Sequence, residues 1–156
     1  MINVKALNLK NEKTKYLAFF LGTSLLAPTL YHSLGLSGVV YLPIFLSLSV
    51  GSFFLSPGYL LAIALFSPVL NNIFFGMPSG MMTYVLVFEG IIFSLANMRG
   101  KNIFVNIIIS RISSLALIFF LSGYTYAIWS RNITLGIPGI FLNGILAIIV
   151  ARTFKR

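Results

Sequence analysis

The chain has 156 residues, of which 58% are hydrophobic and 8% are charged, and it contains no cysteine and no aspartate. A soluble domain of this length carries roughly a quarter charged residues, so the composition excludes a soluble enzyme and predicts a protein in a lipid bilayer. The net charge of +9 suggests nucleic acid or anionic lipid as a partner, and the positions of the basic residues must decide between them.

Six apolar segments are long enough to be transmembrane helices. The sequence predicts them at about 16–34, 38–55, 58–75, 81–98, 103–122 and 133–151. Glycine and proline mark the turns between them, as in the stretch Gly76-Met77-Pro78-Ser79-Gly80. We therefore expect an all-α, polytopic membrane protein in which residues 1–156 form a single domain of six helices in one bundle.

The basic residues form three groups, which precede the first segment, separate the fourth from the fifth and follow the sixth. These groups are Lys5, Lys10, Lys13 and Lys15, then Arg99 and Lys101, and finally Arg152, Lys155 and Arg156. With six crossings all three groups fall on one side, and the positive-inside rule makes that side cytoplasmic, with both termini. Their spread along membrane-flanking loops is typical of topology signals and lipid anchors, and no nucleic-acid-binding module is present.

Two charged residues lie inside predicted membrane helices. Glu89 is near the middle of the fourth segment and Arg111 near the middle of the fifth, each about 12–14 Å from the cytoplasmic end at 1.5 Å per residue. A charged side chain at the centre of a membrane helix costs about 2.5–3.5 kcal/mol, so such residues face a protein interior or each other. The two side chains either form an ion pair that fixes helix packing or line a ligand cavity, and these roles are compatible.

Three asparagines in the predicted helices have a structural and a ligand-binding interpretation. Asn71 and Asn72 close the third segment, where they either cap the helix and its turn or contact a ligand near the outer face. Asn143 in the sixth segment either forms a hydrogen bond between helices or contacts a ligand.

Aromatic and small residues add further candidates. Tyr124, Tyr126 and Trp129 lie in the predicted outer loop, as a belt at the membrane surface or as a lid that stacks on a ring-shaped ligand. His32 is the only histidine, and without Asp or Cys neighbours we interpret it as an interfacial helix end and predict no metal site. Ala18 and Gly22, four residues apart, permit close approach of another helix in this chain or in a partner.

Three stretches together resemble a known family. They are Ser67–Asn72 running into Gly76-Met77-Pro78, the helix with Glu89 followed by the helix with Arg111, and Leu135–Asn143 with its Gly136-Ile137-Pro138-Gly139. This pattern, over about residues 60–151, is similar to the substrate-binding S components of energy-coupling factor (ECF) transporters. The resemblance implies a six-helix subunit in a prokaryotic plasma membrane. Such a subunit captures a vitamin or related micronutrient at the outer face and delivers it inward.

The resemblance also implies partners and a site. A transmembrane coupling subunit with two ATPase subunits would dock on the first helix at Ala18 and Gly22, which match the family's Ala-x-x-x-Ala pattern in part. Glu89 and Arg111 stand where related proteins carry a Glu and an Arg. They would favour a polar heterocycle or a zwitterion, enclosed by Tyr84, Tyr126 and Trp129. Their depth places them at the floor of such a pocket or in the pair that holds its walls.

Two other function classes are weighed against this one. A self-contained secondary transporter or channel would use Glu89 as a proton or cation site. An intramembrane enzyme is disfavoured, because the chain offers no Cys, no Asp and no second His for a nucleophile and its base. The chain has no Walker-type phosphate loop, so we expect no cofactor in it and ATP use only by partner subunits.

Overall fold

The structure is a computed structural model that describes residues 4–78, 80–100 and 102–154, with side chains from Glu12 onward. The described range leaves out some residues of the predicted Gly76–Gly80 turn and of the basic groups, namely Ser79, Lys101, Lys155, Arg156 and the side chains of Lys5 and Lys10. All regular secondary structure within the range is helical. The helices are α1 Val4–Ser33, α2 Gly38–Tyr41, α3 Pro43–Gly51, α4 Pro57–Phe75, α5 Gly80–Arg99, α6 Ile103–Ser113, the 3-10 helix η1 Ser114–Phe119, and α7 Tyr126–Phe154.

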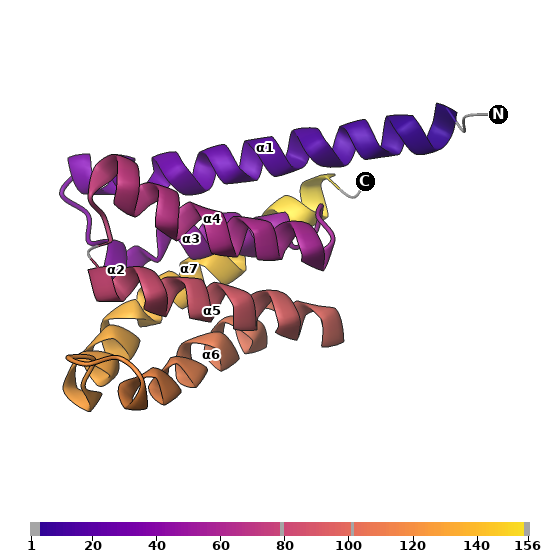
Figure 1. The fold of residues 1–156 in the computed structure, drawn as a ribbon. Coiled ribbons are helices and arrows are strands. Elements are labelled where there is room, and N and C mark those ends of the chain that lie inside the picture. The colour runs from indigo at the N-terminus through magenta and orange to yellow at the C-terminus, as the bar shows by residue number, and fades with distance from the viewer. Residues whose placement is uncertain (1–3, 79, 101, 155–156) are drawn as a thin grey trace.

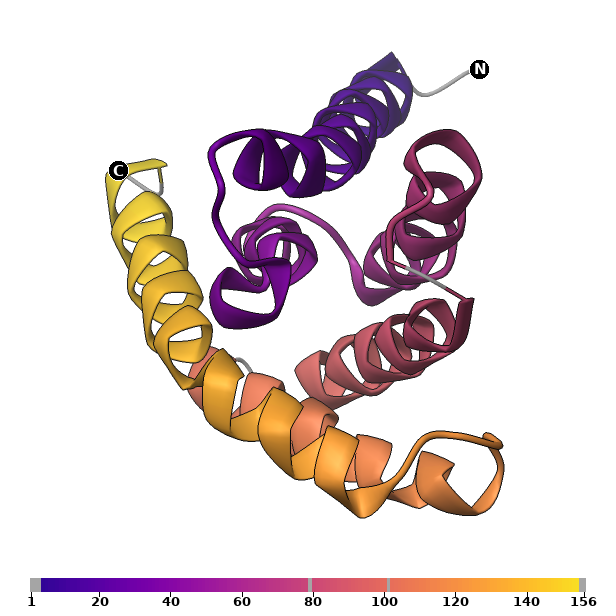
Figure 2. The same ribbon diagram turned by 90° about the vertical axis from the view of Figure 1, so that its left-hand side faces the viewer.

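The helices run back and forth in one bundle, and each predicted segment corresponds to one passage along it (Figure 1). The start of α1 and the end of α7 lie at the same end of the bundle, which we call the terminal end. The other end, which faces the viewer in Figure 2, carries the end of α1, α2, the α4–α5 turn and the start of α7. We call it the cavity end. In this view α2 and α3 lie at the centre, with α1, α4, α5 and α7 around them.

Within the described residues, α4, α5 and α7 are long and apolar enough to cross a membrane. The ranges Gly38–Gly51 and Ile103–Phe119 are shorter apolar stretches. Large apolar side chains are exposed around the bundle, among them Phe66 on α4, Leu95 on α5 and Phe141 on α7. Polar side chains such as Ser67 and Ser94 are instead fully buried. The interior also contains an apolar core that includes Phe45, Leu48 and Phe93. An apolar surface around an interior that holds both apolar and polar side chains suits a bundle in lipid.

Two helices begin earlier than the apolar pattern predicts. Helix α1 begins at Val4 instead of residue 16, because the preceding polar stretch contains neither Gly nor Pro to stop the helix. Helix α7 begins at Tyr126 instead of residue 133. The Gly136–Gly139 stretch, near the start of the predicted segment, therefore lies well inside the helix. A run of apolar residues predicts the part of a helix that can lie in lipid. It does not predict polar turns that extend the helix beyond that part.

The second passage is broken at Leu42, where one continuous helix was expected. Leu42 has a left-handed backbone with φ of 50°, and Pro43 is the first residue of α3. Proline has no N–H to continue a helix and disfavours helical geometry at the residue before it. The Leu42-Pro43 sequence therefore divides the segment into the short α2 and the buried α3.

The fifth passage changes from an α-helix to a 3-10 helix near its end, which the apolar pattern did not predict. The hydroxyls of Ser110, Ser113 and Ser114 each donate to the carbonyl three residues earlier, over distances of 2.7 Å. Such side-chain bonds compete with the regular helical ladder and favour tighter turns. They cluster where α6 gives way to η1, beside Arg111.

Candidate functional site

A cavity of about 560 Å³ opens at the cavity end of the bundle, among the elements that meet there. Its walls come from the end of α1, the connection to α2, α2 itself, the start of α3, the α4–α5 turn and the start of α5, with Arg111 and Asn132. The lining residues are Pro28, His32, Gly35, Leu36, Ser37, Gly38, Val39, Leu42, Pro43, Ile44, Phe45, Met77, Pro78, Met82, Leu86, Arg111 and Asn132. The volume is that of a typical small-molecule site.

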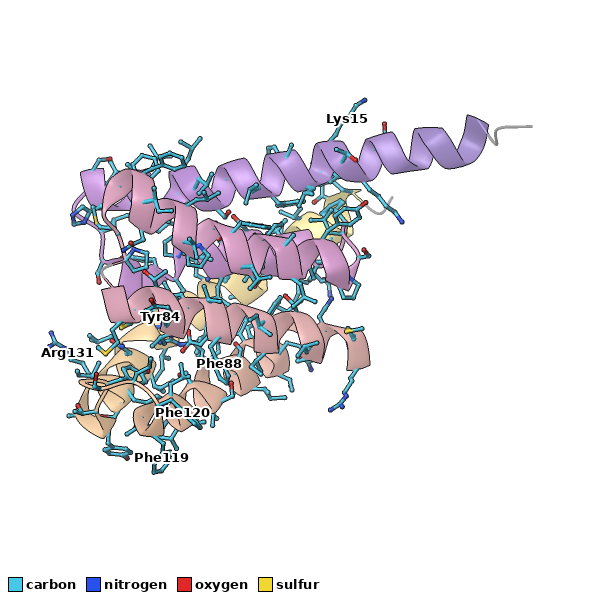
Figure 3. The ribbon with its side chains drawn as sticks, in the orientation of Figure 1. Lys15, Tyr84, Phe88, Phe119, Phe120 and Arg131 are labelled. Carbon is cyan, nitrogen blue, oxygen red and sulfur yellow. The ribbon has the colours of Figure 1, made fainter. Side chains whose placement is uncertain are left out.

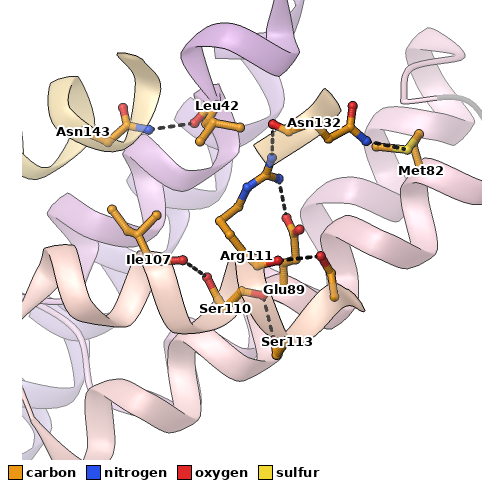
Figure 4. A network of polar contacts seen from close by, with 10 residues as sticks. Leu42, Met82, Glu89, Ile107, Ser110, Arg111, Ser113, Asn132 and Asn143 are labelled. Carbon is orange, nitrogen blue, oxygen red and sulfur yellow. Dashed lines mark hydrogen bonds and ion pairs between the residues drawn. The ribbon is translucent and has the colours of Figure 1, made fainter. Parts of the chain in front are cut away.

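The two intramembrane charges form a buried ion pair, as one interpretation of the sequence predicted. Nη1 of Arg111 donates to Oε2 of Glu89 over 2.7 Å, and the side chains are 3% and 1% exposed (Figure 4). Nη2 of Arg111 donates to the backbone carbonyl of Asn132, also over 2.7 Å. The pair therefore joins α5, α6 and α7. Arg111 reaches the cavity wall, whereas Glu89 lies behind it and is not among the lining residues.

The glycines in the middle of α7 make room for this arrangement. A Cβ atom on Gly136 would lie 3.1 Å from Nη2 of Arg111. A Cβ atom on Gly139 would collide with the backbone of α2, at the Val40 carbonyl oxygen and 2.9 Å from the Tyr41 carbonyl carbon. The two missing side chains bring α7 against the break at Leu42, which forms part of the cavity wall.

Asn143 fastens the same break. Its Nδ2 donates to the Leu42 carbonyl over 3.0 Å and to the Tyr41 carbonyl over 3.3 Å, and the residue is fully buried. The side chain thus forms the predicted type of bond between helices, and it is not among the residues that line the cavity. It thereby holds in place the part of the cavity wall formed by Leu42.

Replacement of Asn143 by Ala should leave the carbonyls of Tyr41 and Leu42 without this donor. We expect the free energy of unfolding to fall by about 1 kcal/mol, the usual cost of a hydrogen bond between buried helices. Thermal unfolding of the detergent-purified protein measures the change. Thr134→Ala on α7 is the control, because the Thr134 hydroxyl is exposed and bonds only to Ser130 of its own helix. Equal stability of the two variants would contradict the role of Asn143.

Asn71 and Asn72 have structural partners. Asn71 was expected to cap the end of its helix or to contact a ligand, but it lies inside α4, four residues before the last residue of that helix. Its Nδ2 donates to the Ser24 carbonyl of α1 over 3.0 Å. That carbonyl is available because Pro28, four residues on, has no N–H to donate to it. Asn72 donates to the Pro78 carbonyl in the α4–α5 turn. Neither side chain is among the cavity-lining residues.

The aromatic residues expected to enclose a ligand lie away from the cavity lining. Tyr84 on α5 and Tyr126 on α7 are each 65% exposed (Tyr84 is labelled in Figure 3). Trp129 packs against Tyr126 with ring centroids 5.5 Å apart, and both belong to the first turns of α7 instead of a loop. These positions suit the predicted belt at the membrane surface. None of the three lines the cavity, so the expected aromatic lid is not formed in this structure.

Tyr124, in the connection before α7, is the buried aromatic residue of this group, at 2% exposure. The pKa of its hydroxyl is raised above the usual value, chiefly because the side chain is buried, and hydrogen bonding to Ser114 and Asn132 offsets part of this shift. Ser114 also interacts with the Glu89 carboxylate. Tyr124 therefore extends the polar network around the ion pair towards the η1–α7 connection.

Several lining residues were missed by the sequence analysis. His32 was interpreted as a helix end, and Asn132 was given no role, yet both line the cavity. Met82 also lines it, and its sulfur accepts a hydrogen bond from Nδ2 of Asn132 over 3.7 Å. The Leu42-Pro43 dipeptide is the feature of the sequence that could have indicated a cavity here. A proline within an apolar segment indicates irregular backbone, and such backbone can line a cavity.

The predicted docking residues lie on the surface of α1. Ala18 is exposed, and a Cβ atom on Gly22 would meet nothing within 4 Å. Beside them, α1, α3 and α7 border an apolar groove of about 450 Å³ whose lining includes Phe19, Thr23 and Leu146. This face of α1 has room for a neighbouring helix.

Comparison of the chain with protein-family models, curated proteins and solved structures finds no match.

Proposed function

We propose that this protein is a membrane-embedded substrate-binding subunit, of the S-component type, of an ECF-type ABC importer. It would capture a vitamin-like organic molecule at the cavity end and release it inward when docked to a coupling subunit with two ATPases. The observation that carries the proposal is the 560 Å³ cavity, whose wall includes Arg111, a buried charged residue.

The distribution of charge supports the orientation. Lys13, Lys15, Arg99 and Arg152 lie towards the terminal end of the bundle, while Arg131 lies at the cavity end (Lys15 and Arg131 are labelled in Figure 3). By the positive-inside rule, six crossings would place both termini in the cytoplasm and the cavity at the outer face. A cavity at the outer face suits uptake.

A self-contained transporter or channel that uses Glu89 has less support. The Glu89 carboxylate is bound by Arg111 at 2.7 Å and is separated from the cavity by that side chain. An ion or proton site would need access to Glu89 from an aqueous path.

Affinity purification of the tagged protein from its native membranes tests the proposal. We expect a coupling subunit and two ATPases to be recovered with it, and a small organic molecule to be found by mass spectrometry of the denatured complex. Uptake by vesicles that contain this chain alone, lost in Glu89→Gln, would instead support the self-contained transporter and overturn the proposal.

The docking face provides a matched pair of variants for the same experiment. Ala18→Trp places a bulky ring on the exposed face of α1, and we expect loss of the ATPases from the purified complex. Leu95→Trp places the same ring at an exposed position of α5 and should retain them. Recovery of the ATPases with Ala18→Trp would place the docking face elsewhere.

A further inference from the structure

The charge of Arg111 is already balanced on the protein side of the cavity. Nη1 is bound to the Glu89 carboxylate and Nη2 to the Asn132 carbonyl, and Nε has no hydrogen-bond partner among the described residues. A guanidinium group has five N–H donors, so this side chain holds unused donors while its charge is neutralised. A buried donor without a partner is costly, which favours a ligand that supplies an acceptor.

The rest of the wall is mostly apolar. Besides the polar residues His32, Ser37 and Asn132, two glycines and three prolines, the rest of the wall consists of aliphatic, methionine and phenylalanine side chains. The exposed lining residues, such as His32 and Ser37, mark the mouth, and the buried ones, such as Phe45 and Arg111, mark the floor. A ligand that enters past His32 and Ser37 therefore meets mostly apolar side chains below the mouth and the guanidinium at the floor.

From this arrangement we propose that the cavity takes a small, uncharged, mostly apolar molecule that carries a hydrogen-bond acceptor, a carbonyl oxygen or a ring nitrogen. The acceptor binds the free donors of Arg111 at the floor, and the apolar part lies against Leu42, Phe45 and Leu86. This assignment rests on the proposed function and names the chemistry of its substrate.

Electrostatics disfavours a charged ligand in this place. Glu89 and Arg111 sum to zero, so a ligand carboxylate would add a second negative charge to a site with a single cation. Charges in a poorly solvated interior are stable only when each is compensated. A zwitterion would also need an anionic partner for its cationic group. The cavity-lining residues include no Asp and no Glu.

Three naphthalene derivatives of nearly equal size test the assignment. The full-length protein in lipid nanodiscs is dialysed against 2-acetylnaphthalene, with a ketone acceptor, 2-ethylnaphthalene, with none, and 2-naphthoate, an anion. Retention by empty nanodiscs is subtracted. We expect protein-dependent retention of the ketone to exceed that of either other compound about tenfold, the usual effect of a hydrogen bond to a charged group.

Glu89→Met with Arg111→Met removes every guanidinium donor without leaving a lone buried charge, so the ketone preference should disappear; Arg131→Lys, at an exposed arginine, should keep it. Leu86→Trp places a larger ring in the cavity wall and should lower ketone retention even if the double variant fails to fold. Together these variants assign the preference to the cavity. Equal retention of ketone and hydrocarbon, a preference for naphthoate, or no retention of any compound would overturn the assignment.

The outcome is independent of the importer proposal, since the nanodiscs contain no partner subunit. A ketone preference in a protein that never recovers ATPases would overturn the importer function alone. Recovered ATPases together with a preference for naphthoate would overturn the ligand class alone.

Discussion

Arg111→Ala should lower the free energy of unfolding by about 3–5 kcal/mol, the largest effect we expect from a single substitution. The change leaves the Glu89 carboxylate, 1% exposed, without its cation, and an uncompensated buried charge is among the most costly defects in a protein. It also removes the donor to the Asn132 carbonyl and so loosens the start of α7. Unfolding in detergent with increasing denaturant, followed by circular dichroism, measures the loss.

The double variant Glu89→Met with Arg111→Met separates the penalty of the lone charge from the value of the pair. Replacement of a whole buried pair by apolar side chains of similar volume is often neutral for stability, so the double variant should recover most of the loss. Arg131→Ala is the control for removal of an arginine, because Arg131 is exposed. A single variant as stable as the parent protein would show that the pair does not hold the bundle together.

Gly139→Ala should be the second most damaging change, although it adds only one methyl group. The new Cβ would collide with the carbonyl groups of Val40 and Tyr41, and backbone cannot turn aside as a side chain can. Helix α7 must therefore move away from the break at Leu42. We expect a loss of about 1–3 kcal/mol in the free energy of unfolding, as for other overpacked sites, together with a loss of ligand retention.

Gly22→Ala is the matched control for this experiment. Gly22 also lies within a helix, but a Cβ atom there meets nothing within 4 Å. Alanine is a better helix former than glycine by about 1 kcal/mol, so this variant should be as stable as the parent or slightly more stable. If both variants lost the same stability, the contact of Gly139 with α2 would not explain the effect.

The sequence alone predicted an all-helical fold and offered the Glu89–Arg111 pair as one interpretation, and both are found in the described residues, where three helices are long and apolar enough to cross a membrane. Nearly charge-free apolar runs leave few alternatives to helices, and two opposite charges at matching depth have few alternatives to each other. The pattern was less informative about helix ends, because polar turns that continue a helix carry no apolar signal. This is why α1 and α7 extend beyond the predicted segments.

The cavity was the part that sequence reasoning could not assemble. Its walls combine His32, Leu42, Met82, Arg111 and Asn132, which come from five separate places in the chain. Asn71 and Asn143, for which the sequence left a structural bond and a ligand contact open, are bound to backbone carbonyls that Pro28 and the Leu42-Pro43 break leave accessible. A buried asparagine looks the same in a sequence whether its partner is a ligand or an irregular stretch of backbone.

The close pairing of Glu89 with Arg111 has an electrical consequence for a protein in an energised membrane. A single charge moved through a potential of 100 mV gains or loses about 2.3 kcal/mol. The two side chains lie 2.7 Å apart and carry opposite charges, so their sum is zero wherever the pair is carried as a unit. Any rearrangement of the bundle that keeps the pair intact therefore moves no net charge at this site and is insensitive to membrane voltage there.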